Sequence, residues 1–526
     1  MKKISAAIIL CFSCLISFSQ KDIDVLHYKF EIVLTDQSDT IHGHTEISLK
    51  FLQPVSQVII DLKQSKGTEK GMYIDNITGP GVKGFMKYDD SVVISLTQAA
   101  KVNDSATYTI TYAGVPGDGL IISRNKFGQR TFFADNWPDR AHQWIPCVDN
   151  PGDKASVEFV VIAPDHYQVI SNGIQIEETN LTDNRKLTHW KEDVPLPTKV
   201  MVIGVAEFAV QYTGDVNCTP VSTWVYSKNR NDGFSDYAPA KDILSFFNSY
   251  IAPYPYRKLA NVQSLTTFGG MENASAIFYF ENSVDGKKDQ EELFAHEIVH
   301  QWFGNMATEK SYSHLWLSEG FATYLTIVYM EKKYGEDKAR AMREEDRAQV
   351  VSFMRSTNNP VVDSVSPFMN LLNANSYQKG GWILHMLRRQ LGDSVFHKAV
   401  QQYYLTYAGK NADTHDLQQV FEKVSGKNLS SFFKQWLYTP GVPKLEVNWK
   451  YDAKAKNLLV TVQQLQQTVF DFPLELSFET RSVKEKMATI QVTQAKQTFT
   501  IPATEEPLSL KIDPKVNMLL EGKLSH

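Results

Sequence analysis

The chain has 526 residues and a formal net charge of −5, and 43% of its residues are hydrophobic. This length is too great for one ordinary hydrophobic core and indicates about three domains of typical size. The small net charge argues against a nucleic-acid partner, and the sequence contains no repeat period and no low-complexity segment.

The N-terminus has the features of an export signal. Two lysines precede an apolar run that ends near Phe18, and the small residues Ser17 and Ser19 suit the −3 and −1 positions of a cut before Gln20. We therefore predict a signal peptide over residues 1–19 and an exported protein, either periplasmic or secreted.

Two alternatives for this segment are a membrane anchor and a lipid anchor on Cys11 or Cys14. The apolar run is short for a spanning helix, and no later stretch is long and apolar enough, so we expect no membrane span after signal cleavage. The mature chain keeps two cysteines, Cys147 and Cys218, and the sequence leaves open whether they pair.

Residues 20–212 are predicted to form an N-terminal β domain. Apolar and polar residues alternate there, and turn signals such as Gly79-Pro80-Gly81 separate the alternating segments. The predicted strands cover residues 28–35, 45–52, 92–96, 106–114, 157–164 and 199–210. The pattern is typical of a large curved sheet or sandwich.

The pattern becomes helical in residues 213–440, after some initial strand. Glycines stand where helix ends are expected, as Gly335 and Gly392 do. The predicted helices cover residues 242–252, 287–304, 320–335, 378–392 and 393–409. We expect catalysis in this middle domain.

Residues 441–526 return to alternation and are predicted to form a small β-sandwich. The predicted strands cover residues 444–451, 457–465, 474–480, 488–494 and 498–502. The order of β domain, helical domain and β domain predicts an α+β multidomain protein.

The middle domain contains the segment "HEIVH", His296 to His300. Residues four apart lie on one face of a helix, so the two imidazoles can share one metal ion. Glu297 lies beside them and can reach a metal-bound water. The alternative is that these histidines are simply packed on a partly apolar helix.

A catalytic zinc site needs a third protein ligand, and Glu319 in "WLSEGFATYL" is the candidate. The first helix is predicted to end at Gly304-Asn305, and a second helix to begin near Ser318, which would be its N-cap. Glu319 would then lie in the first turn and face the first helix. His296, His300 and Glu319 form a His₂Glu set, which is a catalytic composition for zinc.

The segments "HEIVHQWFGN" and "LWLSEGFATYL" resemble the zinc site of the aminopeptidase N family, gluzincins that also include leukotriene hydrolase. "FGGMEN" resembles the exopeptidase loop of that family, and "SYQKGGWILHMLRRQLG" its Tyr-x-Lys-Gly helix. "HQWIPCVDNPGDKASVEFVV" and "FFKQWLYTPGVP" resemble the ends of its N-terminal and catalytic domains. The resemblance covers most of the mature chain. It implies a thermolysin-like catalytic domain and an aminopeptidase that binds one Zn²⁺ ion.

The chemistry that this resemblance implies is hydrolysis of the N-terminal peptide bond by a zinc-activated water. Glu297 would act as general base, and zinc and a neutral donor would stabilise the tetrahedral oxyanion. The resemblance nominates Tyr377 as that donor. The alternative role for Tyr377 is packing at a helix start.

An aminopeptidase must also recognise a free α-ammonium group, which requires a carboxylate at a fixed distance from the zinc. Glu272 is the candidate, within a substrate-binding loop formed by Gly269, Gly270, Met271, Glu272 and Asn273. The glycines would let the backbone approach a peptide closely, and an extended loop could pair with it like an added strand. The alternative is a glycine turn with a solvated glutamate.

The family usually supplies a second amine-binding acid from a Gln-x-Glu segment before its Pro-Cys motif. The corresponding stretch here, "FFADNWPDRAHQWIPC", has no such segment, and Asp135, which lies nearby, is the candidate substitute. This departure leaves the side-chain preference open.

The predicted partners are peptides with a free N-terminus, and we expect a monomer. The alternatives are an epoxide hydrolase of the leukotriene hydrolase type and a non-catalytic peptide-binding relative. Many family members carry a large helical C-terminal domain, whereas this sequence ends at His526, after the small β region. We therefore expect a short form with a more open cleft that accepts longer peptides.

Overall fold

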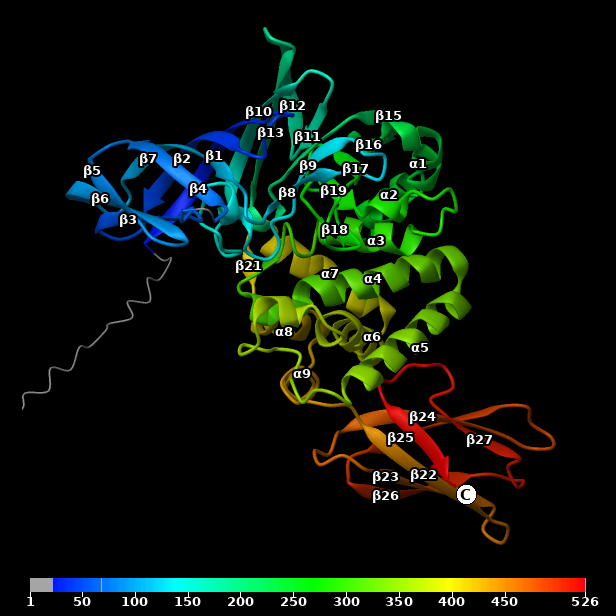
Figure 1. Ribbon diagram of the computed structural model, residues 1–526. Coiled ribbons are helices and arrows are strands. Elements are labelled where there is room, and N and C mark those ends of the chain that lie inside the picture. Colours follow the sequence, from blue (N-terminus) through cyan, green and yellow to red (C-terminus); the bar gives the residue numbers. More distant parts are fainter. Residues whose placement is uncertain (1–21, 68, 526) are drawn as a thin grey trace, which may run out of the picture.

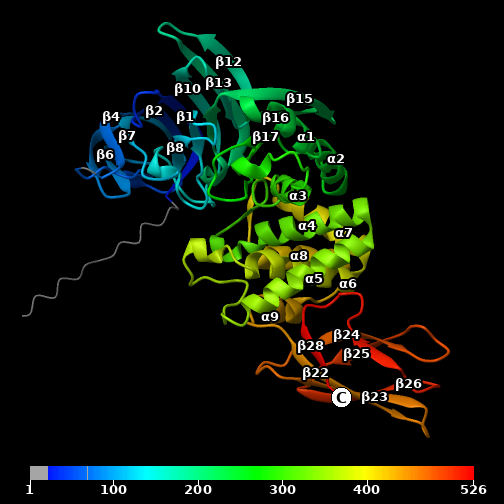
Figure 2. The same cartoon turned by 45° about the vertical axis from the view of Figure 1, so that its right-hand side comes forward.

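The computed structural model describes residues 22–67 and 69–525. Figure 1 shows a β-rich N-terminal part in blue and cyan, a helical middle part in green and yellow, and a second β-rich part in orange and red. The two β-rich parts lie on opposite sides of the helical part (Figures 1 and 2). The predicted α+β multidomain architecture is confirmed. The predicted signal peptide, residues 1–19, lies outside the described residues.

A seven-stranded sheet dominates the N-terminal part. In sheet order its strands are β12 (Ile174–Asn180), β13 (Arg185–Leu196), β10 (Ala155–Pro164), β1 (Ile23–Val33), β2 (Ile41–Phe51), β7 (Ser105–Val115) and β4 (Gly71–Thr78). Burial alternates along β2, because successive side chains in a strand point to opposite faces. The period-two pattern of the sequence therefore marks these strands correctly.

Two smaller sheets complete the N-terminal part. One contains β3 (Val55–Asp61), β6 (Ser91–Ala100) and β5 (Val82–Lys87); the other contains β11 (Gln168–Ser171), β14 (Ile203–Ala206), β9 (Arg130–Ala134) and β8 (Leu120–Arg124). The single strand predicted over residues 199–210 is wrong. The chain changes sheets there, because β14 pairs with β11 and β9, whereas the next strand pairs with the sheet of the middle part.

That middle sheet has five strands. In order they are β15 (Phe208–Val216), β16 (Thr219–Tyr226), β17 (Leu259–Gln263), β19 (Ala276–Tyr279) and β18 (Gly270–Met271). The domain boundary predicted after residue 212 falls inside β15, and the domain bounds stay a prediction. The short strand β18 pairs antiparallel with β19 and forms an edge of this sheet.

Nine α-helices follow within the described residues: α1 (Arg230–Asp236), α2 (Ala240–Tyr250), α3 (Glu291–His300), α4 (Trp316–Tyr334), α5 (Glu336–Phe353), α6 (Gly380–Leu391), α7 (Asp393–Tyr407), α8 (Thr414–Ser425) and α9 (Ser430–Leu437). A π-helical turn over Asn375–Lys379 precedes α6. Short 3₁₀ turns cover Ala141–Gln143, Thr198–Val200, Ser227–Asn229, Glu281–Ser283, Tyr312–His314 and Phe368–Leu371. Strands β20 (Thr308–Glu309) and β21 (Asn411–Ala412) pair in parallel.

Helix α4 is the centre of the helical part and packs against α3, α5 and α6. It crosses α6 very closely, because a Cβ on Gly320 would lie only 2.8 Å from the carbonyl carbon of Gly380. Glycine at both positions therefore allows the two backbones to touch. The close crossing brings Glu319, beside Gly320, near Tyr377, in the turn before α6.

The C-terminal part contains two sheets. One has β26 (Lys496–Pro502), β23 (Asn457–Gln464), β22 (Lys444–Asp452) and β28 (Glu521–Ser525); the other has β25 (Lys486–Val492), β24 (Phe472–Glu479) and β27 (Ser509–Ile512). This part joins the helices through polar contacts such as the 2.7 Å ion pair between Arg347 of α5 and Asp513.

Cys147 is buried and Cys218 is exposed, and both are free thiols. The possible disulfide between them is therefore not present. Within residues 22–67 and 69–525, no helix combines the length and the apolar character needed to cross a membrane.

Candidate active site

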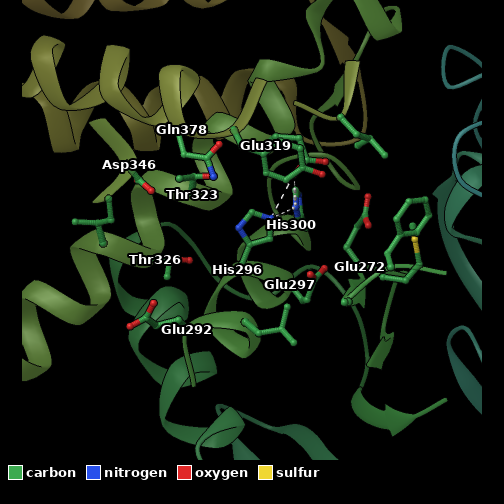
Figure 3. Close-up of a pocket in the computed structure, with 18 of the residues that line it drawn as sticks. Glu272, Glu292, His296, Glu297, His300, Glu319, Thr323, Thr326, Asp346 and Gln378 are labelled. Carbon is green, nitrogen blue, oxygen red and sulfur yellow. Dashed lines mark hydrogen bonds and ion pairs between the residues drawn. The ribbon is translucent and has the colours of Figure 1, made fainter. Parts of the chain in front are cut away.

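The residues of the "HEIVH" segment lie on α3, and their two histidines face Glu319 on α4 (Figure 3). The Nε2 atoms of His296 and His300 are 3.1 Å apart. Each of these atoms lies 3.3 Å from Oε2 of Glu319. Helix geometry explains the arrangement, since residues four apart on α3 share a face and Glu319 lies in the first turn of α4.

These distances fit a metal ion. Tetrahedral zinc ligands at bond lengths of ~2.0–2.2 Å lie about 3.3 Å from one another, close to the separations of the three donor atoms. The Nδ1 atom of His300 lies 3.1 Å from the carbonyl oxygen of Phe303. A hydrogen bond from Nδ1–H to that carbonyl leaves the Nε2 lone pair free to face the centre. The donor set His296, His300 and Glu319 can therefore hold a metal ion.

Ser318 does not cap α4, so that prediction is wrong. The helix begins two residues earlier, at Trp316, and the Ser318 hydroxyl lies 3.1 Å from Nδ1 of His300. Ser318 therefore orients a candidate metal ligand. Glu319 still lies in the first turn, as predicted.

The surroundings shift the pKa values of Glu319 and Glu297 in opposite directions. Burial alone would raise the pKa of Glu319, but the adjacent His300 and His296 hold it well below its usual range. For Glu297 burial dominates, and together with the carboxylates of Glu272 and Glu319 it raises the pKa well above the usual value. The carboxyl of Glu319 thus favours its ionised form, whereas that of Glu297 favours its protonated form.

Gly270 lies directly against Glu297. A Cβ on Gly270 would come within 2.5 Å of Cδ and 2.6 Å of Cγ of Glu297, so only glycine leaves room for this carboxylate. Gly269 differs, because a Cβ there would meet nothing within 4 Å. Neither residue has a positive φ, so the pair serves close approach and not a left-handed turn.

These residues share one cavity of about 490 Å³ (Figure 3). All the predicted site residues except one line it: Gly269, Gly270, Met271, Glu272, His296, Glu297, His300, Glu319 and Tyr377. The structure places Asn273 outside this lining, fully buried beneath the loop.

Two residues that follow the histidines hold the loop with Glu272 in place. The backbone carbonyl of Glu272 accepts hydrogen bonds from Nε2 of Gln301 at 2.8 Å and from Nδ2 of Asn305 at 2.7 Å. The sequence marked Asn305 only as part of a helix end and gave no role to Gln301, although the position of Gln301 directly after "HEIVH" was a signal. The end of α3 and the turn after it thus position two candidate metal ligands and the backbone of Glu272.

Tyr377 stacks on His296, with ring centroids 5.9 Å apart and planes inclined by 10°. Burial, followed by the charges of Glu319 and Glu272, raises the pKa of its hydroxyl well above the usual value. The hydroxyl therefore remains protonated and can serve as a hydrogen-bond donor.

Asp135 does not line the cavity. One of its carboxylate oxygens pairs with Nη2 of Arg140 at 2.7 Å, and the other accepts from the backbone N–H of Thr267 at 2.9 Å. Asp135 therefore anchors the segment before Gly269. Among the described lining residues, the N-terminal part contributes Trp137, so Glu272 is the acid on this side of the cavity.

Comparison with known proteins gives two family matches. Residues 237–436 match the Peptidase family M1 domain, and residues 25–200 match the Peptidase M1 N-terminal domain. The first match contains all the metal-ligand candidates.

Individual relatives agree with these matches. The chain is 26% identical to glutamyl aminopeptidase of Sus scrofa over 460 residues, which cover 81% of this chain and 48% of the relative. It is 28% identical to probable aminopeptidase 2 of Sulfurisphaera tokodaii over 324 residues, or 59% and 41% of the two chains. It is also 28% identical to Tricorn protease-interacting factor F2 of Thermoplasma acidophilum over 454 residues, or 81% and 54%.

The chain spans about half the length of the curated relatives it matches. Both family matches nevertheless fall in the order that the structure shows, with the N-terminal β-rich part before the helical part. Together with the aminopeptidase relatives and the His296–His300–Glu319 cluster, they show that this chain belongs to peptidase family M1, the aminopeptidase N family.

Proposed function

We propose that this chain is a zinc-dependent aminopeptidase that hydrolyses the N-terminal bond of peptides. One observation carries the proposal: a single cavity contains the His296–His300–Glu319 cluster, the acid Glu272 and the edge strand β18. The cluster supports hydrolysis, and the acid directly after the edge strand supports recognition of a free amine.

His296, His300 and Glu319 would hold the zinc ion. The bound ion would polarise the scissile carbonyl and lower the pKa of a water molecule toward neutrality. The three ligands contribute one negative charge, and their donor atoms leave the cavity side open.

Glu297 is the proposed general base. Glu297 is buried, is not one of the three candidate metal ligands, and lines the same cavity as they do. In its ionised form this carboxylate can take a proton from the attacking water and pass it to the leaving amine, and burial raises its affinity for that proton. Gly270 provides the space in which this carboxylate stands.

Tyr377 is the proposed donor to the oxyanion. Its high pKa keeps the proton on the hydroxyl, so the group can donate a hydrogen bond to the oxygen that becomes negative during attack. Stacking on His296 fixes the ring and limits the motion of the hydroxyl.

Glu272 is the proposed receptor for the substrate's α-ammonium group. The bonds from Gln301 and Asn305, which follow α3 in the chain, hold its backbone beside the candidate metal ligands. The outer edge of β18 offers backbone groups with which an extended peptide can pair. A free N-terminus at Glu272 then leaves the first peptide bond at the metal ligands.

We also propose that the protein is exported and acts as a monomer on peptides outside the cytoplasm. The export proposal depends on residues 1–19, which lie outside the described residues. Sequencing of the mature N-terminus in the native host is expected to find Gln20, and size-exclusion chromatography with light scattering is expected to give a monomer mass. A retained Met1 or a stable oligomer would contradict these two points.

The test of the proposed function uses leucine 4-nitroanilide and its N-acetylated form. The free amine is expected to be hydrolysed and the acetylated compound to resist. A chelator should abolish turnover, and added zinc should restore it. Glu297→Gln, a nearly isosteric change, is expected to lower kcat by about 10²–10⁴-fold and to keep the bound zinc. Equal turnover of both substrates, or turnover unaffected by the chelator, would contradict the proposal.

A further inference from the structure

The cavity extends past the metal ligands to the side opposite Glu272. Figure 3 shows Glu292, Thr323, Thr326, Asp346 and Gln378 there, with Glu272 on the other side of the two histidines. We call this region the α5 side of the cavity, lined by Glu292, Thr323, Thr326, Met342, Asp346 and Gln378. Helices α3, α4 and α5 and the turn before α6 contribute these residues.

The α5 side is acidic, and of its two carboxylates only that of Glu292 has a cationic partner in the part of the chain that the structure describes. No lysine or arginine is among the described residues that line the cavity. Glu292 pairs at 2.6 Å with Lys338, and both of these side chains are partly exposed. The side chain of Asp346 has no hydrogen-bond or ion-pair partner within residues 22–67 and 69–525. Burial, followed by the charges of Glu345 and Glu292, raises the pKa of Asp346 to about 7.

Apolar side chains line the same region. Leu293 of α3, Ile327 of α4 and Met342 of α5 face the cavity. Lysine and arginine side chains place their methylene stems on apolar surface and their charged ends in a polar environment. An apolar wall that leads to an unpaired carboxylate therefore has the chemistry of a site for one long cationic side chain.

The direction of a bound substrate follows from the proposed function, on which this inference rests. An α-ammonium group at Glu272 places the first carbonyl at the metal ligands, so the second residue of the peptide continues toward the α5 side. A substrate side chain that enters there belongs to the residue after the cleaved bond.

We propose that the α5 side of the cavity binds the second residue of the substrate and that Asp346 selects lysine or arginine at that position. The bound ammonium or guanidinium group takes the place of the missing cation beside Asp346. The stem packs on the apolar wall, and Thr326 and Gln378 offer further polar contacts. The preferred substrates are thus peptides with a basic residue directly after the N-terminal one.

The test compares two tripeptides that differ by one charge, Leu-Lys-Ala and Leu-norleucine-Ala. The wild type is expected to favour the lysine peptide in kcat/KM by about fivefold or more, the size of one partly buried charge pair. Asp346→Asn is expected to reduce this ratio to within about twofold of one, because the amide keeps the shape and loses the charge.

Glu345→Gln is the matched control. Glu345 is the next residue on α5, is exposed and does not line the cavity, so the change removes the same charge from the same helix. Its ratio of the two kcat/KM values is expected to be at least that of the wild type, because loss of the Glu345 charge favours the ionised form of Asp346. A fall in the ratio with rising salt in the wild type gives an independent reading that needs no variant.

The outcomes separate the two proposals. A wild type that cleaves both tripeptides equally, or a ratio unchanged in Asp346→Asn, would overturn the lysine-selective subsite and leave the aminopeptidase function standing. A protein that cleaves neither tripeptide would overturn the proposed function and the subsite with it. Asp346→Lys gives a final check, since it is expected to favour Leu-Glu-Ala over Leu-Gln-Ala.

Discussion

Replacement of Gly270 by alanine tests the position of the proposed general base. The new Cβ would stand 2.5 Å from Cδ of Glu297, whereas carbon atoms rest about 3.5 Å apart, so one of them must move by about 1 Å. The carboxylate is the free end of a flexible side chain and yields most easily. A shift of about 1 Å in a catalytic group costs about 10²-fold in rate, or ~2.7 kcal/mol of transition-state stabilisation.

The assay is kcat/KM for leucine 4-nitroanilide, with zinc content by mass spectrometry and a thermal melt on the same preparation. Gly270→Ala is expected to lower kcat/KM by about 10²-fold and to keep its zinc, because the change touches none of the three ligands. The melting temperature should change little, since no backbone atom is displaced.

Gly269→Ala is the matched control, because its Cβ would meet nothing within 4 Å. The kcat/KM of Gly269→Ala is expected to be about tenfold or more above that of Gly270→Ala. A folded, zinc-loaded Gly270→Ala protein with the kcat/KM of the wild type would refute the reasoning that Glu297 must stand where the structure places it.

Three further predictions concern other residues. Tyr377→Phe is expected to lower kcat by about 10²-fold with little change in KM, because its hydroxyl bonds an oxygen that is negative only during the reaction; near-normal kcat in steady-state kinetics would remove it from the mechanism. Glu272→Gln is expected to raise KM for free-amine peptides about tenfold without loss of zinc, and an unchanged KM would contradict its role. Burial lowers the pKa of the Lys154 ammonium to about 7, and the group donates to the carbonyl oxygen of Met306 at 2.8 Å. Between about pH 7 and 10 the unfolded chain then binds more protons, so the free energy of unfolding of the wild type, relative to Lys154→Met, should rise by about 1 kcal/mol per pH unit. Urea titrations at several pH values check this, and parallel pH profiles would contradict it.

The fold class could be predicted because local patterns coincide with the tertiary structure. Period two marks the strands of both β-rich parts, and glycines mark helix ends such as Gly335 after α4. The helix α5 was missed, because residues 336–353 carry many charged side chains and only a thin apolar stripe. The structure has two strands where one was predicted over residues 199–210, because the alternation of apolar and polar residues does not reveal where a chain passes from one sheet to another.

The metal ligands could be predicted because their spacing is local. His296 and His300 share a helix face. Prediction of Glu319 required only that a second helix begin just before it, so the error over the cap at Ser318 did not affect the result. Asp346 could not be found in this way, because only the packing of α5 on α4 brings it to the cavity.

The contact between Gly270 and Glu297 could not be predicted from the sequence either, because it depends on the tertiary structure. The sequence indicated close approach to a peptide, whereas the structure adds the contact with Glu297, which lies on α3. Asp135 illustrates the opposite case, because it is near the site in sequence terms and is already bound to Arg140 and Thr267.

The central claim is that Glu272 binds the free N-terminus of a peptide and thereby places its first peptide bond at the metal ligands. Mass spectrometry of the products from a ten-residue peptide tests this most directly, with the N-terminus either free or acetylated. The account predicts a ladder of products shortened one residue at a time from the free N-terminus, no cleavage of the acetylated peptide, and no products in the presence of a chelator. Internal cleavage, or equal cleavage of the acetylated peptide, would contradict it.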